Sequence, residues 1–397
     1  MKKTLSLILA AVLVATSLSA CKDNTNTPND DIDTNITDTQ DNTNDNNEDI
    51  TDTLTYSEVI SQVDAIVEKQ DMDKTIVMTV GDYDVSLALY RYYYMYWITW
   101  YTYNYGPDWT ENADMVAEFN EYVSQETKFP GLIVNLATEK GISLTQKEFD
   151  EEIATVLDQI KLQYGEDSDS ILYEEFFSTP YFMLVNNTVF LLYNKLFEDF
   201  SAPGTENYEN IKSETIKFYN DNDYVRAKHI LITFPESDDL TEEEKAETLK
   251  KAQAVLDKVN AGEDFDKLIE QYNEDPGMKS SPGGYYFGAG KMVEAFENGT
   301  RELEIGKTSG LVETPYGYHI IKRLPIDDEN IVNSEMFYEI TVDLFNEYML
   351  ANLEAAVADK AENFDTLIQP IIEEGQALID EVKAQQEAIN VTESTEE

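Results

Sequence analysis

The chain has 397 residues, of which 42% are hydrophobic, so it is long enough for two or three domains with apolar cores. It carries 28 Lys and Arg residues against 79 Asp and Glu residues, and the formal net charge of −51 argues against binding to nucleic acid, whose phosphates it would repel. The only cysteine is Cys21, which excludes an internal disulfide.

Residues 1–21 have the pattern of an export signal. Lys2 and Lys3 precede the apolar run Leu5 to Val14, which is too short to cross a bilayer as a mature helix. The run ends in Leu18-Ser19-Ala20-Cys21, which resembles the lipobox of bacterial lipoproteins. That resemblance implies cleavage before Cys21, lipidation of Cys21, and a lipid anchor on the extracytoplasmic face of a cell membrane of the Gram-positive type. The alternative is an ordinary secretory signal with an incidental cysteine.

Residues 22–55 alternate Asn, Thr and Asp almost without apolar residues. Such a segment cannot bury enough surface to offset its ordering entropy, so we expect a disordered tether. As a random coil it would reach roughly 30 Å, enough to hold a lipid-anchored domain away from the membrane.

Residues 56–222 are predicted to form a mainly helical domain that begins with a hairpin over 75–86, which turns at Gly81-Asp82. The stretch Leu89 to Tyr105 is crowded with tyrosine and tryptophan and contains Arg91, so a transmembrane helix is not expected. Three interpretations stay open for this stretch: a helix packed in the domain core, a surface that grips unfolded polypeptide, or a segment that contacts a membrane interface.

Two further helices are predicted in residues 326–390, one over Ser334–Val357 and one around Ile371 to Val382, before a polar tail at 391–397. We expect them to pack back on the helical domain, which would then be discontinuous.

Residues 223–325 contain the only two histidines of the chain. His229 and His319 each lie in a run rich in Ile, Leu and Val, which predicts two strands at opposite ends of the segment. Between them the sequence predicts a helix capped by Thr241, a second helix over Phe265–Tyr272, and a series of glycine turns. This order indicates a small α+β fold in which the first and last strands pair centrally.

Five separated motifs in this segment resemble, in the right order, the parvulin family of peptidyl-prolyl isomerases. They are Val225-Arg226-Ala227-Lys228-His229-Ile230-Leu231-Ile232, Glu274-Asp275-Pro276-Gly277, Gly283-Gly284, Met292-Val293 with Phe296, and Thr314 with Gly317-Tyr318-His319-Ile320-Ile321-Lys322-Arg323. With the lipobox and the flanking helices, the whole chain resembles a PrsA-type foldase lipoprotein. The resemblance implies an α/β isomerase domain inserted into a helical chaperone domain of the SurA and PrsA kind.

The resemblance also assigns roles to individual residues. His229 and His319 match the paired active-site histidines, Asp275 stands where the family has Asp or Cys, and Thr314 matches a threonine of their hydrogen-bond network. Met292 and Phe296 match the apolar wall that holds the substrate proline. The implied substrates are unfolded or newly exported polypeptides that contain X-Pro bonds. No cofactor and no metal are expected.

Two features depart from the family. The loop from Asp275 to Gly284 is a residue longer than usual, and Tyr285-Tyr286-Phe287 replaces the common Asp-Leu-Gly, so Tyr286 or Phe287 is expected to form the third wall of the pocket. Parvulins that select phosphorylated Ser/Thr-Pro carry basic residues after the first strand. The segment 236–243 is acidic instead, which predicts an enzyme that does not depend on phosphate.

Other classes of function lack their motifs in this sequence. No Gly-x-Ser-x-Gly motif supports a serine hydrolase, no ligand spacing supports a zinc site, and no repeated βα pattern supports a solute-binding lipoprotein. The main alternative is a non-catalytic holdase chaperone with a vestigial isomerase domain.

Overall fold

The computed structural model describes residues 53–236, 240–327 and 329–393, with side chains described as far as residue 389. The predicted export signal, Cys21 and all but the last few residues of the predicted tether lie outside these ranges. The described chain forms two compact units, one made of residues up to 199 together with 346 onward, and the other of residues 200–345. The predicted domain boundaries at 223 and 325 remain predictions.

The first unit is mainly helical. Its helices are α2 (Tyr56–Ile66), α3 (Asp71–Lys74), α4 (Leu87–Tyr105), α5 (Ala113–Lys140), α6 (Gln146–Tyr164), α7 (Ser168–Glu175), α8 (Pro180–Phe200) and α15 (Phe364–Glu393), with short 3-10 turns at Pro107–Glu111 and Gly165–Asp167. Its strands are β1 (Thr53–Leu54), β2 (Ile76–Val80), β3 (Tyr83–Ser86), β4 (Leu144–Thr145) and β9 (Asp359–Lys360).

The predicted hairpin is confirmed, because β2 and β3 pair antiparallel around a turn in which Gly81 adopts φ +58°. The sequence did not reveal that β9 pairs with the other edge of β2, 280 positions further along the chain, nor that β1 pairs with β4. Helix α5 packs so closely on the hairpin that a Cβ at Gly131 would lie 2.6 Å from the Cβ of Val80.

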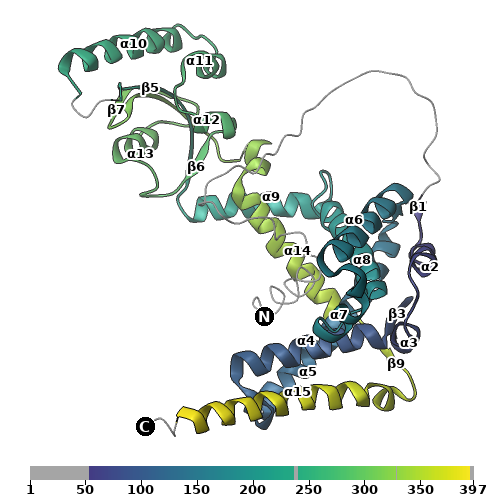
Figure 1. Cartoon of the computed structure of the whole chain (residues 1–397). Helices are drawn as coiled ribbons and strands as arrows, with labels where there is room; N and C mark the ends of the chain where they lie inside the picture. The colour runs from purple at the N-terminus through teal and green to yellow at the C-terminus, as the bar shows by residue number, and fades with distance from the viewer. Residues whose placement is uncertain (1–52, 237–239, 328, 394–397) are drawn as a thin grey trace. The chain divides into compact units, whose positions relative to one another are not determined.

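Most of the aromatic stretch lies in the core of this unit. Tyr93, Trp97 and Tyr101 on α4 are at most 1% exposed, and Trp97 stacks on Tyr122 of α5 at a centroid distance of 4.5 Å. Helix α15 runs alongside α4 (Figure 1). The ring of Tyr103, by contrast, is 89% exposed, so the outer edge of α4 faces solvent. The interpretation as a core helix is therefore confirmed for most of the stretch, and the tyrosines at its outer edge reach water.

The second unit is built on a four-stranded antiparallel sheet in the order β6-β5-β8-β7. Its elements are α9 (Glu206–Asp221), β5 (Val225–Thr233), α10 (Glu242–Asn260), α11 (Phe265–Tyr272), α12 (Gly277–Ser280), β6 (Tyr285–Phe287), α13 (Glu294–Arg301), β7 (Thr308–Thr314), β8 (Gly317–Leu324), a 3-10 turn at Glu329–Asn333, and α14 (Glu335–Ala355), which continues into the first unit. The predicted central pairing of the first and last strands, β5 with β8, is confirmed.

Each face of the sheet is covered by helices. Helices α10 and α11 lie on one face, and α13 lies on the other (Figure 1). Side chains alternate between faces along a strand. Ile230 and Ile320 accordingly enter the core under α10 and α11, whereas Ala227 and Ile321 pack beneath α13. The fold class is the α+β arrangement expected from the sequence.

Candidate active site

The register of the two central strands brings the histidines together. His229 pairs with Ile321 and Leu231 pairs with His319, so the two histidines are diagonal neighbours on adjacent strands. Both belong to the set of side chains that faces α13, since each is an even number of positions from a residue in the core beneath α13. Their ring centroids lie 5.0 Å apart, and the residues are 4% and 5% exposed.

His319 is held by Thr314, the last residue of β7. The Thr314 hydroxyl oxygen lies 2.9 Å from His319 Nε2 and 3.3 Å from the carbonyl oxygen of Gly317. At Gly317, which has φ +148°, the Ile232 carbonyl of the neighbouring strand comes so close that a Cβ would have no room. The threonine oxygen can therefore accept a hydrogen bond from the imidazole Nε2–H while its own O–H donates to the Gly317 carbonyl.

Asp275 approaches His229 from the loop after α11. Its Oδ2 lies 3.1 Å from His229 Nε2, an ion-pair distance, but the contact lacks hydrogen-bond geometry and neither ring nitrogen of His229 has a hydrogen-bond partner among the described residues. Asp275 is fixed instead by two other donors: the Gly277 N–H donates to Oδ1 at 3.0 Å, and the Tyr285 hydroxyl donates to Oδ2 at 2.8 Å.

Burial controls the charge of both imidazoles. It lowers the pKa of His229, although Asp275 acts in the opposite direction. Burial and then the neighbouring His229 lower the pKa of His319 to about 4, again opposed by Asp275. Both rings are therefore neutral at pH 7, and each can present one N–H donor and one acceptor nitrogen.

A pocket of about 850 Å³ opens in front of these groups. Its apolar lining includes Leu231, Phe234, Met292, Val293, Phe296 and Pro315. Met292 and Phe296 thus stand where a proline ring could be seated beside the histidines, and the Phe296 ring centroid lies 5.1 Å from that of His229. The charged residues around the pocket are Glu236, Glu274, Asp275 and Lys291.

Two expected wall residues lie elsewhere. Tyr286 points to the other face of the sheet, where its ring stacks on Tyr219 at 4.8 Å, and Phe287 is a core residue packed behind Phe296. The wall position belongs to Tyr285, which was not singled out from the sequence. The register explains the position of Tyr286, because it pairs with Arg226, whereas Tyr285 pairs with Ala227 and shares a face with His229. Phe287 lies on the same face as Tyr285, but it pairs with Val225, further along β5 from His229.

The arrangement can bind an apolar ring and surround the adjoining amide with polar groups. It offers no activated nucleophile, and no group of three or more His, Cys, Asp or Glu side chains that could hold a metal occurs in the described ranges. An apolar seat beside polar groups is suited to a reaction that rotates a bond without breaking it.

Comparison with known proteins identifies the family of this chain. A sequence model of the PPIC-type peptidyl-prolyl isomerase (PPIASE) domain matches residues 210–325. The chain belongs to the parvulin-type peptidyl-prolyl isomerases, and it is an enzyme of that kind.

Within that class the chain is homologous to the PrsA foldases. It is 33% identical over 220 residues to foldase protein PrsA of Geobacillus kaustophilus (strain HTA426), a match that spans 54% of this chain and 68% of that protein. It is 31% identical over 214 residues to foldase protein PrsA of Geobacillus sp. (strain WCH70), spanning 54% and 69%. The crystal structure of PrsA from Bacillus subtilis is 20% identical over 76% of this chain and 93% of its own, but its TM-score of 0.26 is too low to support a structural argument.

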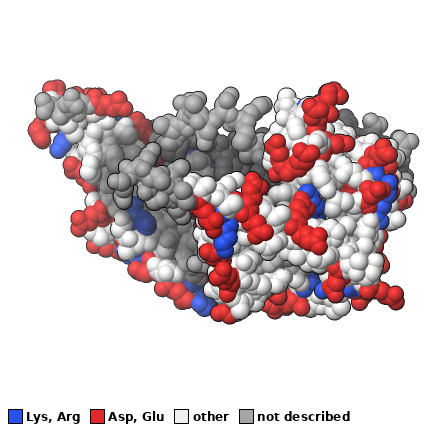
Figure 2. All heavy atoms as spheres, turned by 60° about the horizontal axis from the view of Figure 1, so that its bottom comes forward, with Lys and Arg blue, Asp and Glu red and all other residues white. Residues whose placement is uncertain are grey.

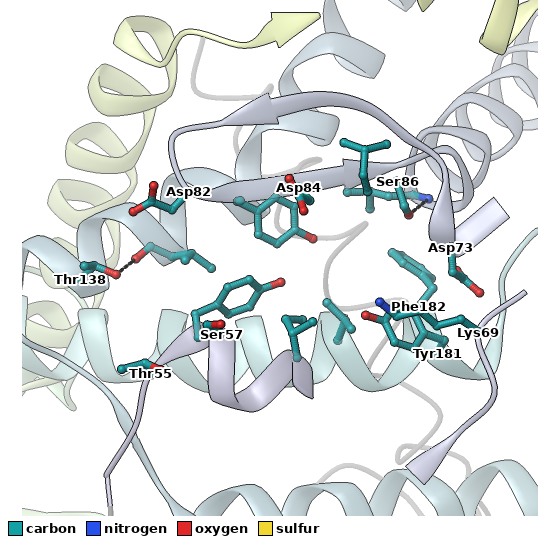
Figure 3. Close-up of a pocket in the computed structure, with 17 residues that line it drawn as sticks. Thr55, Ser57, Lys69, Asp73, Asp82, Asp84, Ser86, Thr138, Tyr181 and Phe182 are labelled. Carbon is teal, nitrogen blue, oxygen red and sulfur yellow. Dashed lines mark hydrogen bonds between the residues drawn. The ribbon is translucent and has the colours of Figure 1, made fainter. Parts of the chain in front are cut away.

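The helical unit has a cavity of its own, of about 430 Å³, between α2, the β2–β3 hairpin and α8 (Figure 3). Asp73 lies at one end near Lys69 and Tyr181. The buried Asp73 carboxylate accepts hydrogen bonds from the Thr179 hydroxyl and the Gln70 N–H, so its neighbours already satisfy it. We assign no ligand to this cavity.

None of the helices in the described ranges is long and apolar enough to cross a membrane.

Proposed function

We propose that the chain is an extracytoplasmic, lipid-anchored foldase that isomerises X-Pro bonds in unfolded or newly exported polypeptides, and that His229, His319, Asp275 and Thr314 form its catalytic site. In this proposal the isomerase domain, 223–325, is inserted into a chaperone-like helical domain formed by 56–222 and 326–390. The observation that carries the proposal is the pair of neutral, buried histidines next to an apolar seat.

Rotation about a prolyl amide faces a barrier of ~18–20 kcal/mol, because resonance keeps the bond planar. Resonance also separates charge in the planar amide, so an apolar pocket formed by Met292 and Phe296 disfavours the planar form more than the twisted one. The neutral imidazoles then supply donors and acceptors to the twisted amide, whose nitrogen has regained its lone pair. Thr314 holds His319 in place during this step.

A first experiment compares prolyl isomerisation of an unphosphorylated tetrapeptide by the full chain and by His229→Ala/Asp275→Ala. We expect the double variant to lose the activity, while Asp257→Ala, which removes an exposed carboxylate on α10, keeps it. Thermal melts show whether each variant is folded. Equal activity in the parent and a folded double variant would refute the assigned site. Absence of activity in both, with suppressed aggregation of an unfolded client, would support the holdase alternative.

We further propose that the enzyme does not prefer phosphorylated substrates. Glu236 and Glu274 stand at the pocket with Lys291 as the one cation among its lining residues, and acidic side chains greatly outnumber basic ones on the face shown in Figure 2. A phosphate there would be repelled. A Ser-Pro peptide should therefore be turned over at least as fast as its phosphoserine counterpart, and a large preference for the phosphopeptide would contradict this.

The lipid anchor is proposed from the lipobox at 18–21. Cells that express the full chain should incorporate labelled palmitate into it, and Cys21→Ser should abolish the label and release the protein from the membrane fraction. Unchanged labelling of the Cys21→Ser protein would exclude Cys21 as the lipidation site.

A further inference from the structure

A second pocket, about 530 Å³ in volume, lies in the helical unit and is independent of the isomerase site. We call it the aromatic groove. It is lined from α4 by Tyr92, Tyr96, Thr99, Trp100, Tyr103 and Asn104, and from the α6–α8 region by Tyr164, Leu172, Glu175, Phe176, Phe177, Ser178, Phe182 and Met183. Its volume is in the range of ligand pockets, and aromatic and methionine side chains are those favoured at binding surfaces.

Two features of the groove point to an occupant. Tyr103 and Phe176 on its walls are 89% and 43% exposed, so large apolar surface faces water. Ser178 is 4% exposed, yet its hydroxyl has no hydrogen-bond partner among the described residues. A buried hydroxyl without a partner costs free energy, and the backbone of a bound peptide would supply the missing partner.

The wall of the groove is also held in a strained shape. Phe177 has φ +56°, a conformation that a bulky residue rarely adopts, and such strain gathers at ligand-binding sites. The buried side chain of Arg91 packs against this part of the wall. Its guanidinium carbon lies 5.4 Å from the centroid of the Phe177 ring and 4.1 Å from that of the Tyr173 ring. The guanidinium group also forms an ion pair with Glu374 at 2.6 Å. The groove is therefore preformed, which lowers the entropic cost of binding.

The charge around the groove selects the occupant. The two wall segments, 92–105 and 164–183, contain Glu166, Asp167, Asp169, Glu174 and Glu175 but no Lys or Arg. Anionic lipid headgroups would be repelled, whereas basic residues beside an apolar anchor would be attracted. We propose that the aromatic groove binds an extended, unfolded polypeptide segment in which large apolar side chains are flanked by Lys or Arg. The proposal rests on the proposed foldase function and names the class of client it holds.

The test uses two labelled, proline-free peptides with the same Leu-Phe-Leu centre, one flanked by lysines and one by glutamates. Because they lack proline, binding is measured apart from the isomerase site. We expect fluorescence anisotropy to show that the full chain binds the lysine-flanked peptide at least about tenfold more tightly, and that salt weakens this binding. Equal affinities for the two peptides would overturn the proposal.

The matched variants are Tyr103→Ser/Phe176→Ser in the groove and Leu249→Ser on α10, which removes an exposed apolar side chain elsewhere. The groove variant should bind the lysine-flanked peptide at least about tenfold more weakly, because central aromatic contacts carry most of such binding energy, and Leu249→Ser should bind it like the parent. Parent-like binding by the groove variant would refute the assignment. Isomerase assays on the same samples distinguish the failure of the proposed isomerase function from the failure of the proposed groove. Peptide binding without isomerase activity would refute the proposed function and support the assignment of the groove.

A different observation concerns the isomerase site. The Tyr285 hydroxyl donates to Asp275 Oδ2 at 2.8 Å, and that same oxygen lies 3.1 Å from His229 Nε2. Gly277 makes this contact feasible, because a Cβ at position 277 would overlap the Tyr285 hydroxyl. We infer that Tyr285 is a positioning residue for the parvulin reaction. Its hydroxyl donates a hydrogen bond to Asp275 Oδ2 and thereby weakens the electrostatic interaction of that carboxylate with His229.

The consequence is electrostatic. Removal of the hydroxyl leaves Asp275 with one donor fewer, so more of its negative charge acts on His229 and favours the protonated imidazole. The other titratable or charged groups that face His229 are His319 on β8 and, around the pocket, Glu236, Glu274 and Lys291. None of them is changed by Tyr285→Phe. The pKa of His229 should therefore rise.

The experiment records kcat/KM against pH for the full chain, for Tyr285→Phe and for Tyr224→Phe, a tyrosine of the same unit that does not line the site pocket. We expect the acid limb of the Tyr285→Phe profile to move upward by about half a unit to one unit, and the His229 Cε1–H NMR resonance to titrate at a correspondingly higher pH. Tyr224→Phe should match the parent. A Tyr285→Phe protein that loses rate equally at every pH, with an unmoved His229 titration, would reduce Tyr285 to a structural role.

Discussion

Acidification should destabilise the second unit, residues 200–345, through His319; we call it the isomerase unit. Its pKa in the folded chain is about 4, against about 6.5 for an exposed imidazole. Between these values the unfolded chain binds a proton that the folded chain does not, so stability rises with pH. The stability that the neutral His319 ring contributes to the folded state is fully present above pH 6.5 and is lost as the pH falls from 6.5 toward 4.

The magnitude follows from the two pKa values. At pH 5 an imidazole of pKa 6.5 is almost fully protonated and one of pKa 4 is almost fully neutral, which corresponds to about 2 kcal/mol of unfolding free energy lost relative to pH 7.5. For a protein of marginal stability this is a large share. His229, whose pKa burial also lowers, adds to the loss with the same sign.

The chain suits the measurement because it has only two histidines, so two Cε1–H resonances report on them without overlap from others. Urea titrations at pH 7.5 and pH 5, followed through these resonances, give the unfolding free energy of the isomerase unit. His319→Gln is the matched control, since it cannot titrate and shares every carboxylate with the parent. We expect the parent to lose about 2 kcal/mol more than the variant. Equal losses, or a His319 resonance that titrates near pH 6.5, would refute the reasoning.

Three further predictions concern single residues. Thr314→Val keeps the shape but leaves buried His319 Nε2 without its partner, so we expect a loss of about 1–3 kcal/mol in urea unfolding and a lower kcat. Met292→Ala should raise KM about tenfold with little change in kcat, because it removes apolar contact with the proline ring. Burial raises the pKa of Glu126 well above its usual range, so the folded helical unit retains a proton that the unfolded chain releases. Glu126→Gln should therefore be more stable than the parent at pH 8, by tryptophan fluorescence in urea, with the advantage shrinking toward pH 4.5.

The strands of the isomerase unit could be predicted from sequence, but the meeting of the histidines could not be derived from hydrophobic pattern alone. Their placement depends on register: because His229 pairs with Ile321, residues with odd numbers on β5 oppose residues with odd numbers on β8. A shift of one residue would place the two rings on opposite faces of the sheet. The hydrophobic pattern of a sequence predicts where strands lie and which side chains share a face, whereas the register between strands arises from the packing of the whole sheet.

The third wall of the pocket shows the same limit. Tyr285-Tyr286-Phe287 has no alternation of polar and apolar residues, so the sequence could not show which of them faces the site. The register excludes Tyr286, which pairs with Arg226, and it places Tyr285, paired with Ala227, nearer to His229 than Phe287, which pairs with Val225. In the helical unit, α4 carries aromatic side chains on every side. Which of these rings are buried depends on α5 and α15, because these two helices cover one part of α4 and leave the side that lines the groove open.

Two opposing influences act on the histidines of this acidic protein. A formal net charge of −51 favours protonated imidazoles, but charges at the surface are screened within about 8 Å at physiological ionic strength. Burial removes the rings from water and acts locally and without screening, and it is the largest cause of the lowered pKa of both. Burial therefore outweighs the surface charge, and the two rings remain neutral from pH 6.5 upward. Since the proposed reaction uses neutral imidazoles, its rate should be flat over that range. Asp275, whose Oδ2 lies 3.1 Å from His229 Nε2 and accepts from the Tyr285 hydroxyl, is the carboxylate in direct contact with a site imidazole.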